Sequence, residues 1–174
     1  MTPRYPTALT LTERVLRSFT VLNIMYGTGI LVLLIASLVA PAVVMSALVG
    51  KPLDSAGAMI RGMRLLMAVG LAGVPIAHLI LARLRAMVLT VRAGDPFVAE
   101  NARRLNEIAV AVLALEVLHL AVGAIVKGEA FVSPGIHVDW SFSFTPWISV
   151  LLLFVLARVF EHGARMRVDL EGTV

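Results

Sequence analysis

The chain has 174 residues, of which 59% are hydrophobic and only 15% are charged, and its mean hydropathy is +0.93. This composition excludes an ordinary soluble domain, in which about 25% of the residues are charged, and it predicts an integral membrane protein. The lack of cysteine excludes disulfides, thiolate metal sites and redox dithiols. The net charge of +4 does not indicate direct binding of nucleic acid, because the basic residues follow a membrane topology.

Four long apolar stretches predict four helices that span the membrane. The stretches 18–50, 65–82 and 140–157 carry no charged residue, and the stretch 108–126 is interrupted only by Glu116. A spanning helix needs about 20 residues, with a range of roughly 17 to 25. We therefore predict an all-α integral membrane protein, a bundle of four transmembrane helices in one domain. The domain covers 1–174, with spans at about 19–44, 64–81, 108–126 and 146–160.

The basic residues predict the orientation of these spans. Eleven of the 15 Lys and Arg residues lie in the N-terminal segment, in the connection 82–107 and in the C-terminal tail 158–174. Cytoplasmic segments of membrane proteins carry an excess of Lys and Arg. We therefore place both termini and the connection 82–107, called the elbow below, in the cytoplasm.

The N-terminal half contains several local signals. Thr10 and Glu13 fit a capping box that predicts a helix start near Leu11. The composition of 46–63 is typical of a loop, which we expect outside the cytoplasm. In the second span, the spacing of Gly70, Gly73 and Ala77 permits close helix contact. Pro75 predicts a kink, which is either a hinge or tolerated packing.

The elbow predicts a tight helical hairpin. Gly94 suits the left-handed position that closes a helix, Asp95 can cap the next helix and Pro96 suits its first position. Apolar residues on both arms recur at steps of three and four, which predicts that spans two and three continue into the cytoplasm as a packed hairpin. The repeating positions are Leu81, Leu84, Val88 and Val91 before the turn and Phe97, Asn101, Leu105, Ile108 and Val112 after it.

The charged side chains of the elbow have two interpretations. Their spacing allows ion pairs within one helix, which favours a solvated face that pairs with itself. The alternative is a docking face for a cytoplasmic partner. The candidate docking residues are Arg92, Asp95, Glu100, Arg103 and Arg104.

Glu116 and His119 bring unusual chemistry into the third span. They lie three residues apart and so share a helix face, and a carboxylate within a bilayer is costly unless it is paired, protonated or turned inward. His78 of the second span is a candidate third member. A structural polar pair, a proton- or ligand-responsive site and a metal site remain alternatives. Di-iron bundles need a second Glu-x-x-His motif and two further carboxylates, so we predict no metal or other cofactor.

The connection 127–145 alternates apolar and polar residues from Ile136 to Thr145. This period of two predicts a short β-like outer loop between helices 3 and 4, with a first strand at 130–132. The aromatic residues of this loop fit a belt that positions the fourth span at the membrane surface, and the alternative is a ligand-sensing surface.

The elbow and the ending of the chain carry a resemblance to a known family. The elbow residues are Arg92, Ala93, Gly94, Asp95, Pro96, Phe97, Glu100, Asn101, Arg103, Arg104 and Leu105. The ending runs through Val159, Phe160, Glu161, His162, Gly163, Ala164 and Arg165 and then from Val168 to Val174. Across nearly its whole length the chain resembles the bacterial family called domain of unknown function 2975. The resemblance implies a four-helix, multi-pass protein of the bacterial inner membrane, often encoded beside a small helix-turn-helix transcription regulator, and it supplies no catalytic residues.

Two classes of function follow from these features. The first is a non-enzymatic regulator or sensor that binds a small cytoplasmic helix-turn-helix protein through the elbow and the tail. The second is a small transporter, channel or proton-responsive protein that uses Glu116, His119 and His78. A homo-oligomer would give the second class more room for a pathway. We expect no enzyme, because no nucleophile, acid pair or metal-ligand set converges on one face.

Overall fold

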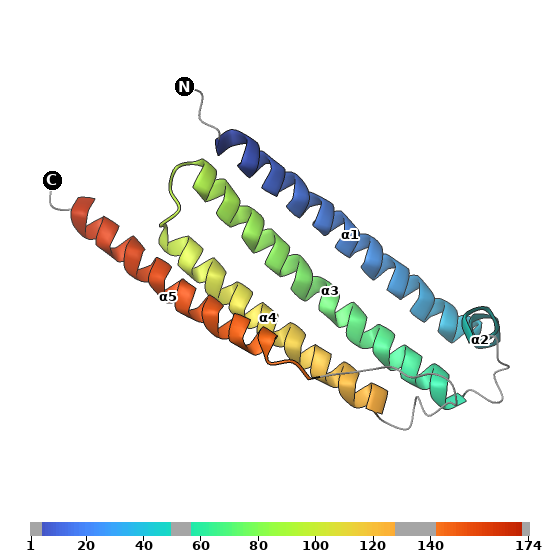
Figure 1. Cartoon of the computed structure of the whole chain (residues 1–174). Helices are drawn as coiled ribbons and strands as arrows, with labels where there is room; N and C mark the ends of the chain where they lie inside the picture. Colours follow the sequence, from blue (N-terminus) through green and yellow to red (C-terminus); the bar gives the residue numbers. More distant parts are fainter. Residues whose placement is uncertain (1–4, 50–56, 128–141, 172–174) are drawn as a thin grey trace. The chain divides into compact units, whose positions relative to one another are not determined.

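The computed structural model describes residues 5–49, 57–127 and 142–171, and every regular element in them is a helix (Figure 1). The helices are α1 (Tyr5–Val39), α2 (Pro41–Val49), α3 (Gly57–Arg92), α4 (Ala99–Lys127) and α5 (Thr145–Glu171). By length and composition, α1, α3, α4 and α5 are able to cross a membrane. The predicted all-helical class with four such helices is confirmed, and the chain is a multi-pass membrane protein. The predicted first strand at 130–132 and most of the alternating segment lie outside the described residues.

The helices contribute to two compact units. Unit 1 contains Met1–Asn23, Ile76–Leu115 and Phe144–Val174, and unit 2 contains Ile24–Pro75 and Glu116–Ser143. Thus α1, α3 and α4 each supply one part to each unit, whereas α5 belongs to unit 1. The single domain proposed from the sequence stays a prediction.

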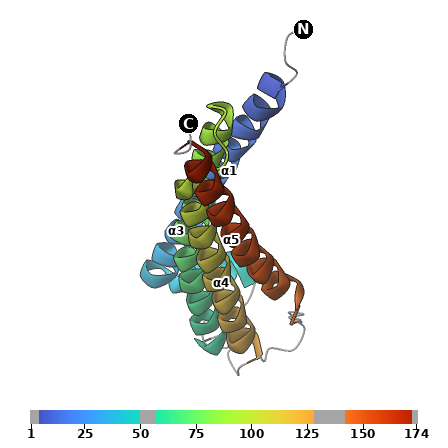
Figure 2. The same ribbon diagram turned by 90° about the vertical axis from the view of Figure 1, so that its left-hand side faces the viewer.

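The core of unit 1 lies along one face of α4. Asn101, Leu105 and Ile108 are buried, as the repeat of three and four residues predicted. Small residues of α5, Ala157 and Ala164, are also buried and permit close approach of this helix. The first part of α4 and α5 lie side by side in both views (Figure 1, Figure 2).

The turn of the elbow closes α3 as predicted but opens α4 differently. Gly94 has a φ of 82°, the amide of Gly94 donates to Val91 O (3.1 Å) and that of Asp95 donates to Thr90 O (3.0 Å). These two bonds form a Schellman motif, which satisfies the last carbonyls of a helix. However, α4 begins only at Ala99, so the prediction that Asp95 and Pro96 start it is wrong.

Asn101 explains the later start of α4. Its side-chain amide donates to Thr90 Oγ1 (2.7 Å) and to Pro96 O (2.9 Å), and its Oδ1 accepts from Arg104 Nη1 (2.9 Å). The Asn101 side chain thereby binds the backbone between the two helices and holds it outside the helix. Asn101 is only 1% exposed, so these bonds satisfy a polar group that would otherwise be buried without partners.

In unit 2, α1 and α3 approach closely at glycines. A Cβ on Gly27 would lie 2.9 Å from Val74 Cγ1, and one on Gly70 would lie 3.3 Å from Ile30 Cδ1. The close contact predicted at Gly70 is confirmed. Helix α3 continues through Pro75.

A break between α1 and α2 falls within the predicted span 19–44. Pro41 has no amide hydrogen, so Ser37 O lacks the donor that the next helical turn would supply. Arg64 of α3 replaces it: its Nη2 donates to Ser37 O, and its Nε donates to Ser37 Oγ (3.3 Å). Ser37 is 1% exposed, so a side chain from another helix completes the end of α1.

Both ends of the predicted outer loop 46–63 are helical. Helix α2 extends to Val49 and α3 begins at Gly57, because Met45, Met59 and Ile60 bury one another in a small apolar cluster. The expected helix start near Leu11 is also wrong, since α1 already begins at Tyr5.

Candidate functional site

Ion pairs connect the helices of unit 1 near the elbow. Glu13 of α1 accepts a hydrogen bond from Arg92 Nη1 (2.7 Å) and lies 3.6 Å from Arg85 Nη2. Glu13 therefore joins α1 to α3 instead of capping a helix. Arg83 of α3 forms an ion pair with Glu107 of α4.

Most of the residues proposed as a docking face bind within unit 1. Arg92 pairs with Glu13, and Asp95 pairs with Arg167 of the tail. The guanidinium of Arg103 donates to Glu100 at 2.5 and 3.1 Å. Arg104 donates to Asn101 as described above and lies 3.7 Å from the Glu100 carboxylate.

The side chain of Arg103 is 61% exposed and that of Arg104 only 17%. Arg103 is therefore much more accessible to a partner than Arg104, whose side chain contributes to the packed elbow. The elbow charges form separate groups: Glu13 with Arg85 and Arg92, Asp95 with Arg167, and a set on α3 and α4 that contains Arg83, Glu100, Arg103, Arg104 and Glu107. The pairs among Glu100, Arg103, Arg104 and Glu107 lie within α4, as their spacing predicted. Their role in docking stays a prediction.

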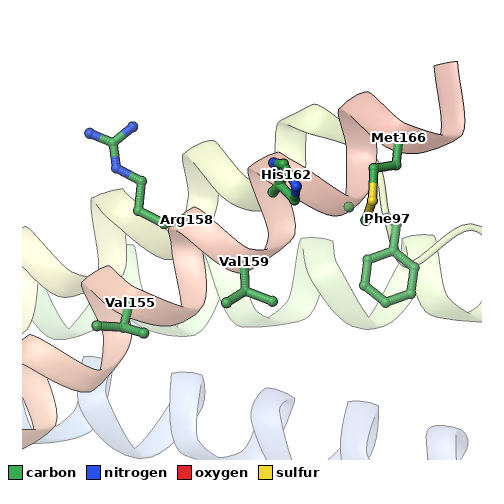
Figure 3. Close-up of a pocket in the computed structure, with 7 residues that line it drawn as sticks. Phe97, Val155, Arg158, Val159, His162 and Met166 are labelled. Carbon is green, nitrogen blue, oxygen red and sulfur yellow. The ribbon is translucent and has the colours of Figure 1, made fainter. Parts of the chain in front are cut away.

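A groove lies between the elbow and the end of α5. It has a volume of about 700 Å³ and is lined by Phe97 and by Val155, Arg158, Val159, His162, Gly163 and Met166 of α5. Figure 3 shows Val155 and Val159 on the side of α5 that faces Phe97, whereas Arg158 extends away from them. The bottom of the groove is therefore apolar, and its rim carries Arg158 and His162.

Gly163 positions the ring of Phe97 in this groove. A Cβ at Gly163 would lie 3.2 Å from Phe97 Cδ1, so a larger residue there would require the ring to shift slightly. On the other side, the rings of Phe97 and Phe160 lie 5.3 Å apart in a tilted arrangement, a favourable geometry for two aromatic rings. The elbow and α5 thus meet through packed rings as well as through the Arg167 to Asp95 ion pair.

Sequence reasoning missed this groove. The signal was present, because Val155, Val159 and Met166 recur on one helix face and continue beyond Arg158, the first charge of α5. The basic residues of the tail drew attention away from this stripe, in which Val155, Val159 and Met166 are each about half exposed. A hydrophobic stripe that extends into a charged segment is the pattern that would have indicated it.

Of the three residues proposed for a polar site, Glu116 is buried, whereas His119 and His78 are exposed. Glu116 is 7% exposed and its Oε1 has no hydrogen-bond partner among the described residues. His119 shares its helix face by spacing but is exposed, and both belong to unit 2. His78 is exposed and belongs to unit 1, so a shared site stays a prediction.

Among the residues that the structure describes, no group of three or more His, Asp and Glu side chains is arranged to hold a metal ion.

The fold defines an all-helical, multi-pass membrane protein with a charged elbow between its second and third candidate spans. Residues 36–174 match the family described as Protein of unknown function (DUF2975), and the chain belongs to this family. The match confirms the resemblance carried by the elbow and the ending. No curated protein and no solved structure matches the chain.

Proposed function

We propose that this protein is a non-enzymatic membrane regulator that binds a small cytoplasmic DNA-binding protein in the groove between Phe97 and α5. The observation that carries the proposal is the position of the groove. Val159, His162 and Met166 follow Arg158, the residue at which the uncharged part of α5 ends. In this proposal the apolar surface beyond that residue lies outside the hydrocarbon core and faces water, and contiguous exposed apolar surface of this kind marks an interaction site.

Charge and shape support a helical segment as the occupant. The groove follows the axis of α5, and a groove with an apolar bottom suits the apolar face of an amphipathic helix. Arg158 is exposed at its rim, and Arg165 is exposed one turn beyond His162. Acidic residues beside the apolar face of the partner would complement these arginines.

The positive-inside distribution places the groove in the cytoplasm in this proposal. The family resemblance supports the type of partner, because it implies a neighbouring gene for a small helix-turn-helix regulator. Retention of such a regulator at the membrane would control its access to DNA without any catalytic step.

Co-purification tests this proposal. The protein would be purified from membranes in mild detergent together with a tagged copy of the helix-turn-helix regulator encoded beside it. The double variant Val159→Gln/Met166→Gln makes the bottom of the groove polar and should abolish recovery of the regulator. The control is Leu89→Gln/Val91→Gln, which changes two similarly exposed apolar residues at the end of α3.

The control double variant should recover as much regulator as the wild type. Equal recovery with the groove variant would refute docking in the groove. Loss of recovery with both double variants would also refute it, because the effect would then follow from general surface polarity.

A second candidate function rests on the burial of Glu116. Glu116 is 93% buried, and one of its oxygens has no hydrogen-bond partner among the described residues. Such a carboxylate is costly within a bilayer and is a candidate proton-binding group. In this alternative the protein moves or senses protons through Glu116, with His119 and His78 as auxiliary groups. Proteoliposomes with a pH-sensitive dye would show a proton flux that Glu116→Gln abolishes; an equal flux in wild type and variant would eliminate this function.

A further inference from the structure

A second cleft adjoins the groove beside Phe97 and lies between α5 and the first turns of α4. It measures about 680 Å³, within the range of about 300 to 1,000 Å³ that is usual for ligand sites. Its polar lining consists of Arg103 and Asn106 from α4 and Arg158 and Glu161 from α5. Phe154, Val155 and three alanines supply the apolar lining.

The cleft lies where both helices change from charged to uncharged sequence. On α4, Glu107 is the last charged residue before the apolar run that begins at Ile108. On α5, Arg158 is the first charged residue after an uncharged run that includes Phe154 and Val155. The cleft therefore spans the boundary between the hydrocarbon core and the headgroup layer, with an apolar part on one side and a charged part on the other.

The charge around the cleft is positive even though its arginines are paired. Arg103 pairs with both Glu100 and Glu107, and Glu161 pairs with both Arg158 and Arg165. Arg83 also pairs with Glu107, and Arg104 also lies near Glu100, so five arginines share three glutamates. The excess positive charge favours an anion. Arg103 and Arg158 belong to different helices and are 61% and 83% exposed, so both guanidinium groups can reach a group in the cleft.

The apolar part of the cleft distinguishes a lipid from a small anion. Ala99 and Ala102 leave open volume on the α4 side, and Phe154 and Val155 offer apolar surface on the α5 side. A free phosphate would use the arginines but leave this surface uncovered. Basic pockets between membrane helices at the surface of the bilayer are a recognised type of site for phosphorylated lipid headgroups.

We propose that the cleft binds an anionic phospholipid from the leaflet next to the elbow. Arg103 and Arg158 hold the headgroup phosphate, Asn106 donates a hydrogen bond to it, and the start of an acyl chain lies against Phe154 and Val155. Bound there, the lipid joins α4 to α5 and couples the elbow to the composition of the membrane. The cleft shares Val155 and Arg158 with the groove beside Phe97, whereas Arg103, Asn106 and Phe154 line the cleft and not the groove.

Native mass spectrometry of the detergent-purified full chain tests the proposal. The probes are phosphatidylglycerol and cardiolipin, with zwitterionic phosphatidylethanolamine as the reference lipid and excess inorganic phosphate as a competitor. Arg103→Gln/Arg158→Gln should reduce the preference for the anionic lipids at least about tenfold, since each basic residue near a membrane surface contributes substantially to anionic lipid binding. The matched control is Arg14→Gln/Arg17→Gln, which removes two exposed arginines of α1.

A second variant distinguishes lipid binding in the cleft from attraction of lipids by the overall surface charge. Ala99→Phe fills open volume at the exposed first residue of α4 without changing any charge. It should also reduce retention of the anionic lipids. Size-exclusion profiles and the detergent midpoint of unfolding should stay those of the wild type in every variant.

Three results would overturn the proposal. Unchanged lipid preference in the Arg103 and Arg158 double variant would exclude these arginines as the headgroup site. An equal loss in the Arg14 and Arg17 control, or full retention in Ala99→Phe, would indicate a diffuse charge effect instead of the cleft. Complete competition by inorganic phosphate would identify the occupant as a free anion.

Discussion

The helices within unit 1 and the helices within unit 2 are joined by different kinds of contact. In unit 1, charged and polar side chains connect helices, with Glu13, Arg83, Asn101 and Arg167 each binding a residue from another element or from the turn. In unit 2, the described contacts between α1 and α3 are the close packing of Gly27 on Val74 and of Gly70 on Ile30, together with the hydrogen bonds from Arg64 to Ser37.

The difference follows from the sequence available to each unit. Unit 1 contains the elbow and the tail, where water can solvate any charge that is not perfectly paired, so ion pairs are tolerated at low cost. Unit 2 contains longer uncharged stretches, where helix association depends on close packing because lipid offers no hydrophobic driving force. The comparison predicts that removing a polar side chain from unit 1 lowers the free energy of unfolding substantially only where that side chain is buried. In unit 2, enlarging a side chain at a helix contact should lower it.

The largest effect is expected for Asn101→Ala in unit 1. The substitution removes hydrogen bonds to Thr90, Pro96 and Arg104 from a residue that is 1% exposed. With about 0.5 to 1.5 kcal/mol for each of the three bonds, the free energy of unfolding should fall by about 1.5 to 4.5 kcal/mol. Dodecyl sulfate titration in micelles measures it, and Asn106→Ala on the exposed side of α4 should change it little. Equal effects of the two substitutions would contradict the role given to Asn101.

Arg64→Ala tests the hydrogen bonds from Arg64 to Ser37, the polar contact described between α1 and α3 in unit 2. It leaves the buried Ser37 O without a donor and should cost about 1.5 to 3 kcal/mol, the range for hydrogen bonds to charged groups. Pro41→Ala restores an amide hydrogen to the next turn, so Arg64→Ala should cost clearly less in that background. A double-mutant cycle in the same titration measures the coupling. Zero coupling would show that Arg64 does not replace the donor that Pro41 lacks.

The sequence predicted the helices and their buried faces better than the residues at which the helices begin and end. Four spans follow from the uncharged stretches, and the buried face of α4 follows from its period. The closing turn follows from Gly94, because a left-handed residue after a helix has few alternatives to glycine. These features depend on local pattern alone.

Features that depend on side-chain contacts outside a single helix were missed. The start of α4 is set by Asn101, which binds backbone five residues earlier, and the end of α1 is set by Arg64 from another helix. Glu13 fitted a local capping pattern, yet its partners lie more than 70 residues away. The groove beside Phe97 depends on Gly163 in the same way.

Gly27→Ala tests close packing in unit 2, with Gly29→Ala as its control. The added Cβ at Gly27 would meet Val74 Cγ1 at 2.9 Å, and a β-branched side chain has little freedom to move away. Overpacking of this kind costs about 1 to 3 kcal/mol. At Gly29 nothing lies within 4 Å, so the same change should leave the unfolding midpoint nearly unaltered. Similar midpoints for both variants would mean that the α1 to α3 contact is looser than described.

The smallest effect is expected for Arg103→Gln. Arg103 contacts both Glu100 and Glu107, but its side chain is the most exposed of the elbow arginines discussed, and exposed ion pairs are weakened by competing water and by salt. Any loss of stability should be confined to low ionic strength and should disappear when the unfolding titration is repeated in high salt. A large loss that persists in salt would show that Arg103 supports the elbow structurally. In that case the lipid experiment would have to rely on Ala99→Phe, which fills the same cleft without touching the ion pairs.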